Sequence, residues 1–249
     1  MNKIAIILIF LFGILRVQGQ DTLVTSLKPN KSKRFKYESL IVPTVLIGYG
    51  VFGLENHSLK LLNESTQNEF NEHIDSKFTI DDFSQYSPFL SVYVLNAFGN
   101  KGKNNFKDRT IILGTAYLIM GGTVNILKHT GTVERPDGSS KNSFPSGHTA
   151  TAFMGAEFLY QEYKDVSVWY GISGYLVATG TGLFRIYNNR HWLTDVATGA
   201  GIGILSTKIA YWLYPLIQNS FFKDKENTKG IVFPFYNGRE FGLGVSITF

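Results

Sequence analysis

The chain has no cysteine, and only 17% of its 249 residues carry a charged side chain. The missing cysteine excludes disulfides, thiolate metal sites and lipid attachment through a cysteine. Lys and Arg residues are scattered and form no groove-like repeat with aromatic residues, so the net charge of +5 does not indicate a nucleic-acid partner. The His, Asp and Glu residues form no cluster with the spacing of metal ligands, so the sequence predicts neither a metal nor a cofactor.

Apolar residues are abundant instead, since 44% of the chain is hydrophobic and it contains 20 Phe and 13 Tyr. The chain opens with Lys3, continues with an apolar run from Ile4 to Leu15 and then becomes polar, which is typical of a signal peptide over residues 1–19. An uncleaved anchor is the alternative, although this run is short for a bilayer span of about 20 residues. Both interpretations predict an exported chain in the envelope of a bacterial cell.

Five later apolar segments have lengths that favour helices. They are Ser39–Leu54, Tyr86–Gly99, Thr110–Leu127, Val166–Phe184 and Val196–Phe222. The third and fourth contain 18 and 19 uncharged residues and reach the lower limit for crossing a bilayer, while the others suit a bundle. Between these two lies another helix-like stretch, Thr149–Tyr163. The sequence therefore predicts an all-α, membrane-associated helical bundle.

The C-terminal tail has a different pattern. Ile231–Tyr236 and Arg239–Phe249 flank the dipeptide Asn237-Gly238, and apolar residues alternate with Gly, Ser and Thr near the end. This pattern predicts a short β-hairpin with a two-residue type I′ turn. We therefore divide the chain into a signal peptide (1–19), an N-terminal extension with the first helix (20–80), a helical core (81–222) and a tail with the hairpin (223–249).

Three short motifs combine cations, histidines and one carboxylate. They are KHTGTVERP (Lys128–Pro136), PSGH (Pro145–His148) and RIYNNRHWLTD (Arg185–Asp195). The charges of Lys128, Arg135 and Arg185 can neutralise phosphate oxygens, and an arginine fork can hold two of them at once. The Ser146 hydroxyl and the backbone amides around Gly147 lie where a helix is expected to begin, which favours anions. The motifs therefore indicate a phosphate site that needs no metal.

The pattern Lys-x6-Arg-Pro, Pro-Ser-Gly-His and Arg-x5-His-x3-Asp resembles the type 2 phosphatidic acid phosphatase (PAP2) superfamily, which also includes bacterial acid phosphatases and vanadium haloperoxidases. The resemblance covers about 81–214. It implies that His191 is the nucleophile of a phosphohistidine mechanism and that Asp195 fixes its tautomer. It also implies that His148 protonates the departing alkoxide and later activates water.

Neighbouring residues receive no catalytic role from the sequence. Asp137 and the run Asn188–Arg190 are expected to form loops, and His129 is expected to be incidental. Tyr187 and Trp192 either line a substrate entrance or pack in the core. Phe184 stands where the family commonly has Ser, which extends an apolar wall and favours a lipid-bearing substrate.

The sequence therefore favours a metal-independent phosphatase for lipid phosphate monoesters or diphosphates, with the lipid and the membrane as its partners. The wording RPDGS…NSFPSGHTATAF looks most like the bacterial lipid A phosphatases. Placing the basic run Lys101–Arg109 in the cytoplasm puts the site on the periplasmic face, although the basic run Lys28–Lys36 conflicts with this scheme. The alternatives are a soluble periplasmic acid phosphatase, a vanadium haloperoxidase, and a non-enzymatic membrane module, against which the intact motifs argue.

Overall fold

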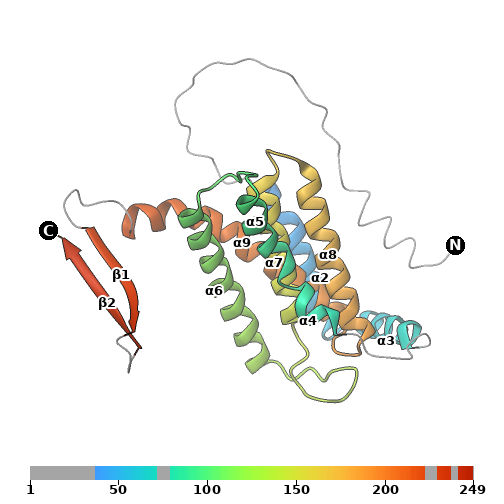
Figure 1. Cartoon of the computed structure of the whole chain (residues 1–249). Coiled ribbons are helices and arrows are strands. Elements are labelled where there is room, and N and C mark those ends of the chain that lie inside the picture. The colour runs from blue at the N-terminus through green and yellow to red at the C-terminus, as the bar shows by residue number, and fades with distance from the viewer. Residues whose placement is uncertain (1–36, 72–78, 222–228, 237–240, 249) are drawn as a thin grey trace. The chain divides into compact units, whose positions relative to one another are not determined.

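The computed structural model describes residues 37–71, 79–221, 229–236 and 241–248. The predicted signal peptide and the basic run Lys28–Lys36 lie outside these residues. The described part is mainly helical (Figure 1). In chain order its elements are the 3-10 helix η1 (Tyr37–Leu40), α2 (Ile41–Gly53), α3 (His57–Asn71), α4 (Ile80–Ser84), α5 (Ser87–Ala97), α6 (Phe106–Thr130), α7 (Gly147–Tyr163), α8 (Val168–Tyr187), α9 (Leu193–Phe221), β1 (Lys229–Tyr236) and β2 (Phe241–Thr248).

The helices follow the apolar segments of the sequence, and polar caps set where several of them begin. The five apolar segments correspond to α2, α5, α6, α8 and α9, which confirms that prediction. Asn105 caps α6, because its side chain accepts a hydrogen bond from the Asp108 amide at 2.9 Å. Ser146 and Ser167 cap α7 and α8 in the same way. The apolar pattern did not predict α3, whose residues are largely polar, or α4, which has only 5 residues.

α7 is the central helix, because it packs against α4, α5, α6, α8 and α9. Its contact with α9 is so close that it requires glycine. A Cβ on Gly199 would lie 2.4 Å from the Ser146 carbonyl oxygen, and one on Gly203 would lie 2.3 Å from the Ala150 carbonyl oxygen. This contact fixes the first turn of α7 against the first turns of α9.

Two described helices, Phe106–Thr130 and Leu193–Ser220, are long and apolar enough to cross a membrane. With 25 residues, α6 is about 37 Å long, which exceeds a hydrocarbon thickness of about 30 Å. The pair Tyr37–Gly53 and His57–Phe70 passes the same test together and is bent by 97°. The predicted candidate Val166–Phe184 forms most of α8, which is not among the described helices that qualify.

Buried charges lie between the helices away from the three motifs. Arg109 and Glu162 are each 1% exposed, and Arg109 Nε lies 3.9 Å from Glu162 Oε2. The Tyr211 hydroxyl donates to Glu162 Oε1, and Lys208 Nζ donates to Glu157 Oε1 at 2.7 Å. Because a buried charge is costly unless it is paired, these contacts fix α6, α7 and α9 relative to one another.

The C-terminal segments β1 and β2 pair antiparallel, with Lys229 opposite Thr248 and Tyr236 opposite Phe241. A two-residue turn at Asn237-Gly238 would instead place Tyr236 opposite Arg239. The expected two-residue type I′ turn is therefore wrong, because the register leaves four residues between the paired ends. Those four residues, 237–240, lie outside the described part of the chain.

Candidate active site

The three motifs meet at one end of the helical bundle, where α6 and α8 end and α7 and α9 begin (Figure 1). Lys128 lies in the last turn of α6, and its Nζ donates to the Asn142 carbonyl at 2.7 Å. The Ser146 amide donates to the Asp195 carbonyl at 3.1 Å, which joins the second motif to the third. The alternating helix directions therefore bring these segments together, as the sequence predicted.

The second motif forms the first turn of α7. Ser146 is fully buried and its hydroxyl is 2.8 Å from the Thr149 hydroxyl, so it serves first as the helix cap. Gly147 and His148 are the first two residues of the helix, where backbone amides have no partner within the helix. Amides in this position favour an anion. The peptide bond between Phe144 and Pro145 is cis.

His191 and Asp195 form a buried pair. His191 is 2% exposed and Asp195 is fully buried, and Nδ1 of the histidine lies 3.4 Å from Oδ2 of the aspartate. The same Oδ2 atom accepts hydrogen bonds from the Trp192 amide at 2.9 Å and from the Ser143 hydroxyl. Because Nδ1 faces the carboxylate, Nε2 is the nitrogen left for attack on a substrate.

Burial lowers the pKa of His191 from 6.5 to about 4. The hydrogen bond and charge of Asp195 act in the opposite direction, while Lys128 and Arg185 lower the pKa further. His191 is therefore neutral at neutral pH, which is the form that a nucleophile requires. The positive charges of Lys128 and Arg185 therefore act on this imidazole.

Arg185 is held by two acidic residues to which the sequence analysis gave no role. Its NH1 atom bonds to Asp81 Oδ2 and lies 3.7 Å from Asp82 Oδ1. Asp81 is 1% exposed, and its other oxygen accepts a hydrogen bond from Asn188 Nδ2 at 3.1 Å. Asp82 Oδ1 lies 2.9 Å from His148 Nε2. One feature of the sequence could have drawn attention to these two residues, because Asp81-Asp82 is the one pair of adjacent acidic residues in the chain.

Arg135 and Arg185 each retain an unpaired donor. The Nε atoms of both side chains are buried and have no hydrogen-bond partner among the described residues. Burial lowers the pKa of Arg135, and so do the nearby charges of Arg185 and Arg190. Guanidinium groups that repel one another and each keep a buried Nε donor without an acceptor fit an anion with several oxygens, such as a phosphate.

The loop between α6 and α7 is tied to the connection between α8 and α9. Arg190 pairs with Asp137 at 3.2 Å, and the Trp192 indole donates to the Glu134 carbonyl at 2.8 Å. Asp137 and Arg190 were expected to form loops, and Trp192 was expected to line an entrance or pack in the core, whereas the three residues join the first motif to the third. On the other side, Asn63 of α3 donates to the Thr194 hydroxyl at 3.0 Å, a contact that the sequence analysis missed.

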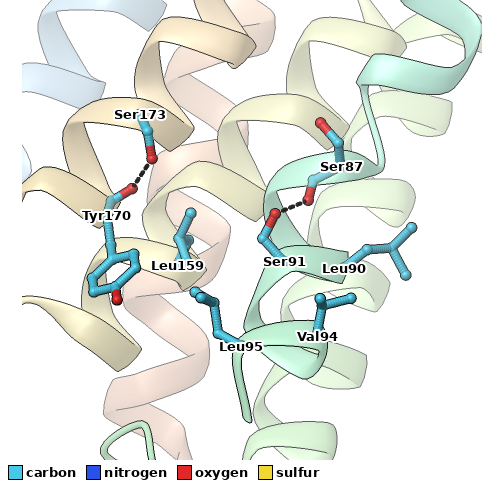
Figure 2. A pocket seen from close by; sticks show the side chains of 8 residues that line it. All are labelled: Ser87, Leu90, Ser91, Val94, Leu95, Leu159, Tyr170 and Ser173. Atoms are coloured by element: carbon cyan, nitrogen blue, oxygen red, sulfur yellow. Dashed lines mark hydrogen bonds between the residues drawn. The ribbon is translucent and has the colours of Figure 1, made fainter. Parts of the chain in front are cut away.

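A separate apolar groove of about 450 Å³ lies between α5 and α8, with Leu159 of α7 at its base (Figure 2). Two of its serine hydroxyls bond to their own helices, since the Ser91 hydroxyl donates to the Ser87 carbonyl and the Ser173 hydroxyl donates to the Tyr170 carbonyl. None of the predicted site residues lines this groove. Its walls are therefore suited to hydrocarbon rather than to phosphate.

Comparison with known proteins shows a similarity to one family. The model of the PAP2 superfamily matches residues 109–218, which contain all the predicted site residues. A lipid A 1-phosphatase of Porphyromonas gingivalis is 45% identical over 141 residues, which are 55% of this chain and 31% of that protein. The bacitracin transport permease protein BcrC of Bacillus licheniformis is 35% identical over 77 residues, which are 31% of this chain and 36% of that protein. The chain thus spans about a third of the length of these curated relatives.

Two solved structures are also similar. LpxE of Aquifex aeolicus has a TM-score of 0.47 and 26% identity, covering 61% of this chain and 95% of that chain. A PAP2-type phosphatidylglycerolphosphate phosphatase of Bacillus subtilis has a TM-score of 0.45 and 18% identity, covering 71% of this chain and 97% of that chain. The match of residues 109–218 to the family model and the 45% identity to the lipid A 1-phosphatase show that this part of the chain is similar to proteins of the PAP2 superfamily.

Proposed function

We propose that this protein is a membrane phosphatase that hydrolyses lipid phosphates through a phosphohistidine at His191. The observation that carries the proposal is the buried His191–Asp195 pair, together with two arginines that interact electrostatically with it and whose Nε atoms have no partner among the described residues. Unpaired donors suit the nonbridging oxygens of a phosphate, and a neutral imidazole suits in-line attack. The PAP2 match over residues 109–218 supports the same reaction.

In the first step, Lys128, Arg135 and Arg185 bind the phosphate oxygens together with the amides at the start of α7. Nε2 of His191 then attacks phosphorus, and the bond between phosphorus and the leaving oxygen breaks with its electron pair going to that oxygen. His148 gives the leaving oxygen a proton. Asp195 stabilises the positive charge that develops on the attacking imidazole.

In the second step, a water molecule attacks phosphorus and the bond to His191 Nε2 breaks. His148, now without its extra proton, accepts a proton from this water. Free phosphate and a neutral His191 result, so the enzyme returns to its starting state. The three cations supply the charge neutralisation throughout, so we propose that no metal takes part.

We propose a lipid phosphate as substrate because the phosphate site lies at the ends of both candidate membrane spans. Lys128 is in the last turn of α6 and Asp195 is in the first turn of α9, which is the level of lipid headgroups if these helices cross the bilayer. The similarity to a lipid A 1-phosphatase favours the same class of substrate. Phe184 and the apolar groove between α5 and α8 offer surfaces for a hydrocarbon chain.

We further propose that residues 81–222 are the phosphatase core, that 20–80 are an N-terminal extension and that 223–249 are an accessory tail, with a signal peptide over 1–19. The site faces the periplasm in this scheme. The basic run Lys101–Arg109 lies at the start of α6, whereas Lys128 lies at its other end. The positive-inside rule favours placing that run in the cytoplasm.

The proposal is tested by assaying the purified full chain in detergent against lipid phosphates, lipid diphosphates and soluble phosphates. His191→Ala should abolish turnover, and the matched control His129→Ala should not, because His129 is exposed and lies outside the pair. Washing membranes with carbonate tests the location. Release of the protein into the soluble fraction, with equal activity on soluble and lipid phosphates, would instead indicate a soluble acid phosphatase.

A further inference from the structure

Asp82 lies on the short helix α4, 66 residues before His148, yet its Oδ1 atom is 2.9 Å from His148 Nε2. α4 is fixed at this place by its neighbours. Asp81 bonds to Arg185, and the Ser84 hydroxyl lies 2.8 Å from the Thr181 hydroxyl of α8. The helix that carries Asp82 is therefore fixed by its contacts with α8, although the Asp82 side chain itself is half exposed.

We propose that Asp82 is a positioning residue that holds His148 through Nε2 and leaves Nδ1 for the proton exchange with the leaving group. This inference rests on the proposed phosphatase function. An ionised carboxylate can only accept hydrogen bonds, so Nε2 of His148 must be the donor. The proton that moves is then the one on Nδ1, and the Nε2 proton stays with Asp82 throughout.

The proton balance of both steps follows from this geometry. As the phosphorus–oxygen bond breaks, the Nδ1 proton passes to the leaving oxygen and His148 becomes neutral. In hydrolysis of the phosphohistidine, the attacking water gives a proton to the Nδ1 lone pair while the phosphorus–nitrogen bond breaks. Asp82 remains ionised in both steps and exchanges no proton.

The charges around His148 give Asp82 a second effect. Burial lowers the pKa of His148 and the positive charge of Arg185 lowers it further, whereas Asp82 and Asp81 raise it. Among the charged groups, these three residues, from α4 and α8, have the largest effects on the pKa of His148. Removing Asp82 should therefore leave less of the protonated form that donates to the leaving group.

The test compares kcat/KM on a long-chain alkyl phosphate and on p-nitrophenyl phosphate for the wild type, Asp82→Ala, Asp82→Glu and the control Asp165→Ala. Asp165 is exposed and lies beyond α7, away from the motifs. An alkoxide leaves poorly without a proton, whereas p-nitrophenolate is a stable anion that needs none. Because kcat/KM covers only the steps through phosphohistidine formation, it reports the proton donation directly.

Asp82→Ala should lower kcat/KM on the alkyl phosphate by at least about tenfold and on p-nitrophenyl phosphate by less than about threefold. The fall of kcat/KM at high pH should move to lower pH, Asp82→Glu should recover part of the loss, and Asp165→Ala should match the wild type. An equal loss on both substrates, or no loss on either, would overturn the positioning role. A wild type that hydrolyses neither substrate would instead overturn the phosphatase function, and this inference with it.

Discussion

Replacing Asp195 by Asn removes one negative charge from the site while nearly preserving the shape of the side chain. Its Oδ2 atom accepts hydrogen bonds from the Trp192 amide and the Ser143 hydroxyl and lies 3.4 Å from His191 Nδ1. An amide oxygen in the same place keeps these acceptor contacts. The fold should therefore survive the substitution, and the change in activity should report the lost charge.

The magnitude follows from the distance between the two side chains. At 3.4 Å and an effective dielectric constant of about 20, a carboxylate and a positively charged imidazole attract by about 5 kcal/mol. Since about 1.4 kcal/mol corresponds to a factor of ten, kcat/KM should fall by roughly 10³- to 10⁴-fold in Asp195→Asn. Ser143→Ala keeps the charge and removes one hydrogen bond to the carboxylate, worth about 1.5 to 3 kcal/mol, so its loss should be roughly 10- to 100-fold.

The assay is hydrolysis of a lipid phosphate in detergent micelles, combined with trapping of the radiolabelled phosphoenzyme. Asp195→Asn should form the phosphoenzyme slowly, His191→Ala should form none, and Ser143→Ala should lie between Asp195→Asn and the wild type. A loss below about tenfold in Asp195→Asn would refute the argument that Asp195 stabilises charge on His191. So would a Ser143→Ala protein that is as inactive as Asp195→Asn.

Other predictions concern metals, pH and the lipid chain. Activity should survive EDTA, and orthovanadate should inhibit because it can adopt the trigonal bipyramid of the transition state; loss on chelation that Mg²⁺ or Zn²⁺ restores would contradict this mechanism. Because burial lowers the pKa of His191 to about 4 and the pKa of His148 below 6.5, kcat/KM should peak between about pH 4 and pH 6.5, and a maximum above pH 7 would count against these roles. The lowered pKa of His191 also means that the unfolded chain binds more protons, so stability is full above pH 6.5 and should decrease by up to roughly 3 kcal/mol as the pH falls to about 4. Thermal unfolding at pH 7 and pH 4.5 measures this effect, and His191→Gln should reduce it. Long-chain lipid phosphates should exceed short-chain analogues in kcat/KM by at least about tenfold, and Ser91→Trp in the groove should reduce that preference while Leu118→Trp on the exposed face of α6 should not.

The sequence predicted the parts of this molecule that depend on local pattern. Uncharged runs predicted the long helices. The His191-x3-Asp195 spacing predicted that the two side chains would meet, as the 3.4 Å contact shows, although His191 lies two residues before α9 and not on a helix. The ends of the apolar runs at Lys128 and Arg185 predicted that the motifs would meet at one end of the bundle. The turn of the C-terminal strands was predicted wrongly, because a favourable Asn-Gly dipeptide does not by itself set the register.

Contacts between distant segments could not be predicted in this way. Ser143 reaches Asp195 across 52 residues, and Asp82 reaches His148 across 66 residues. No spacing rule joins these positions, because the packing of α4 and of the loop before α7 decides which side chains meet. The buried Arg109–Glu162 pair was missed for the same reason, since single charges in apolar helices reveal no partner until the helices are packed.

Arg185 shows how such a distant contact changes the chemistry of a residue that the sequence had identified. The motif predicted a phosphate ligand, and a guanidinium can donate through several nitrogens. Asp81 occupies NH1, and Asp81 is in turn held by Asn188, so the plane of the guanidinium is already fixed before a substrate arrives. The buried Nε atom, which has no partner among the described residues, is then a donor that remains for a phosphate oxygen. A donor fixed in advance loses little conformational freedom on binding, so more of its interaction energy is available to stabilise the transition state.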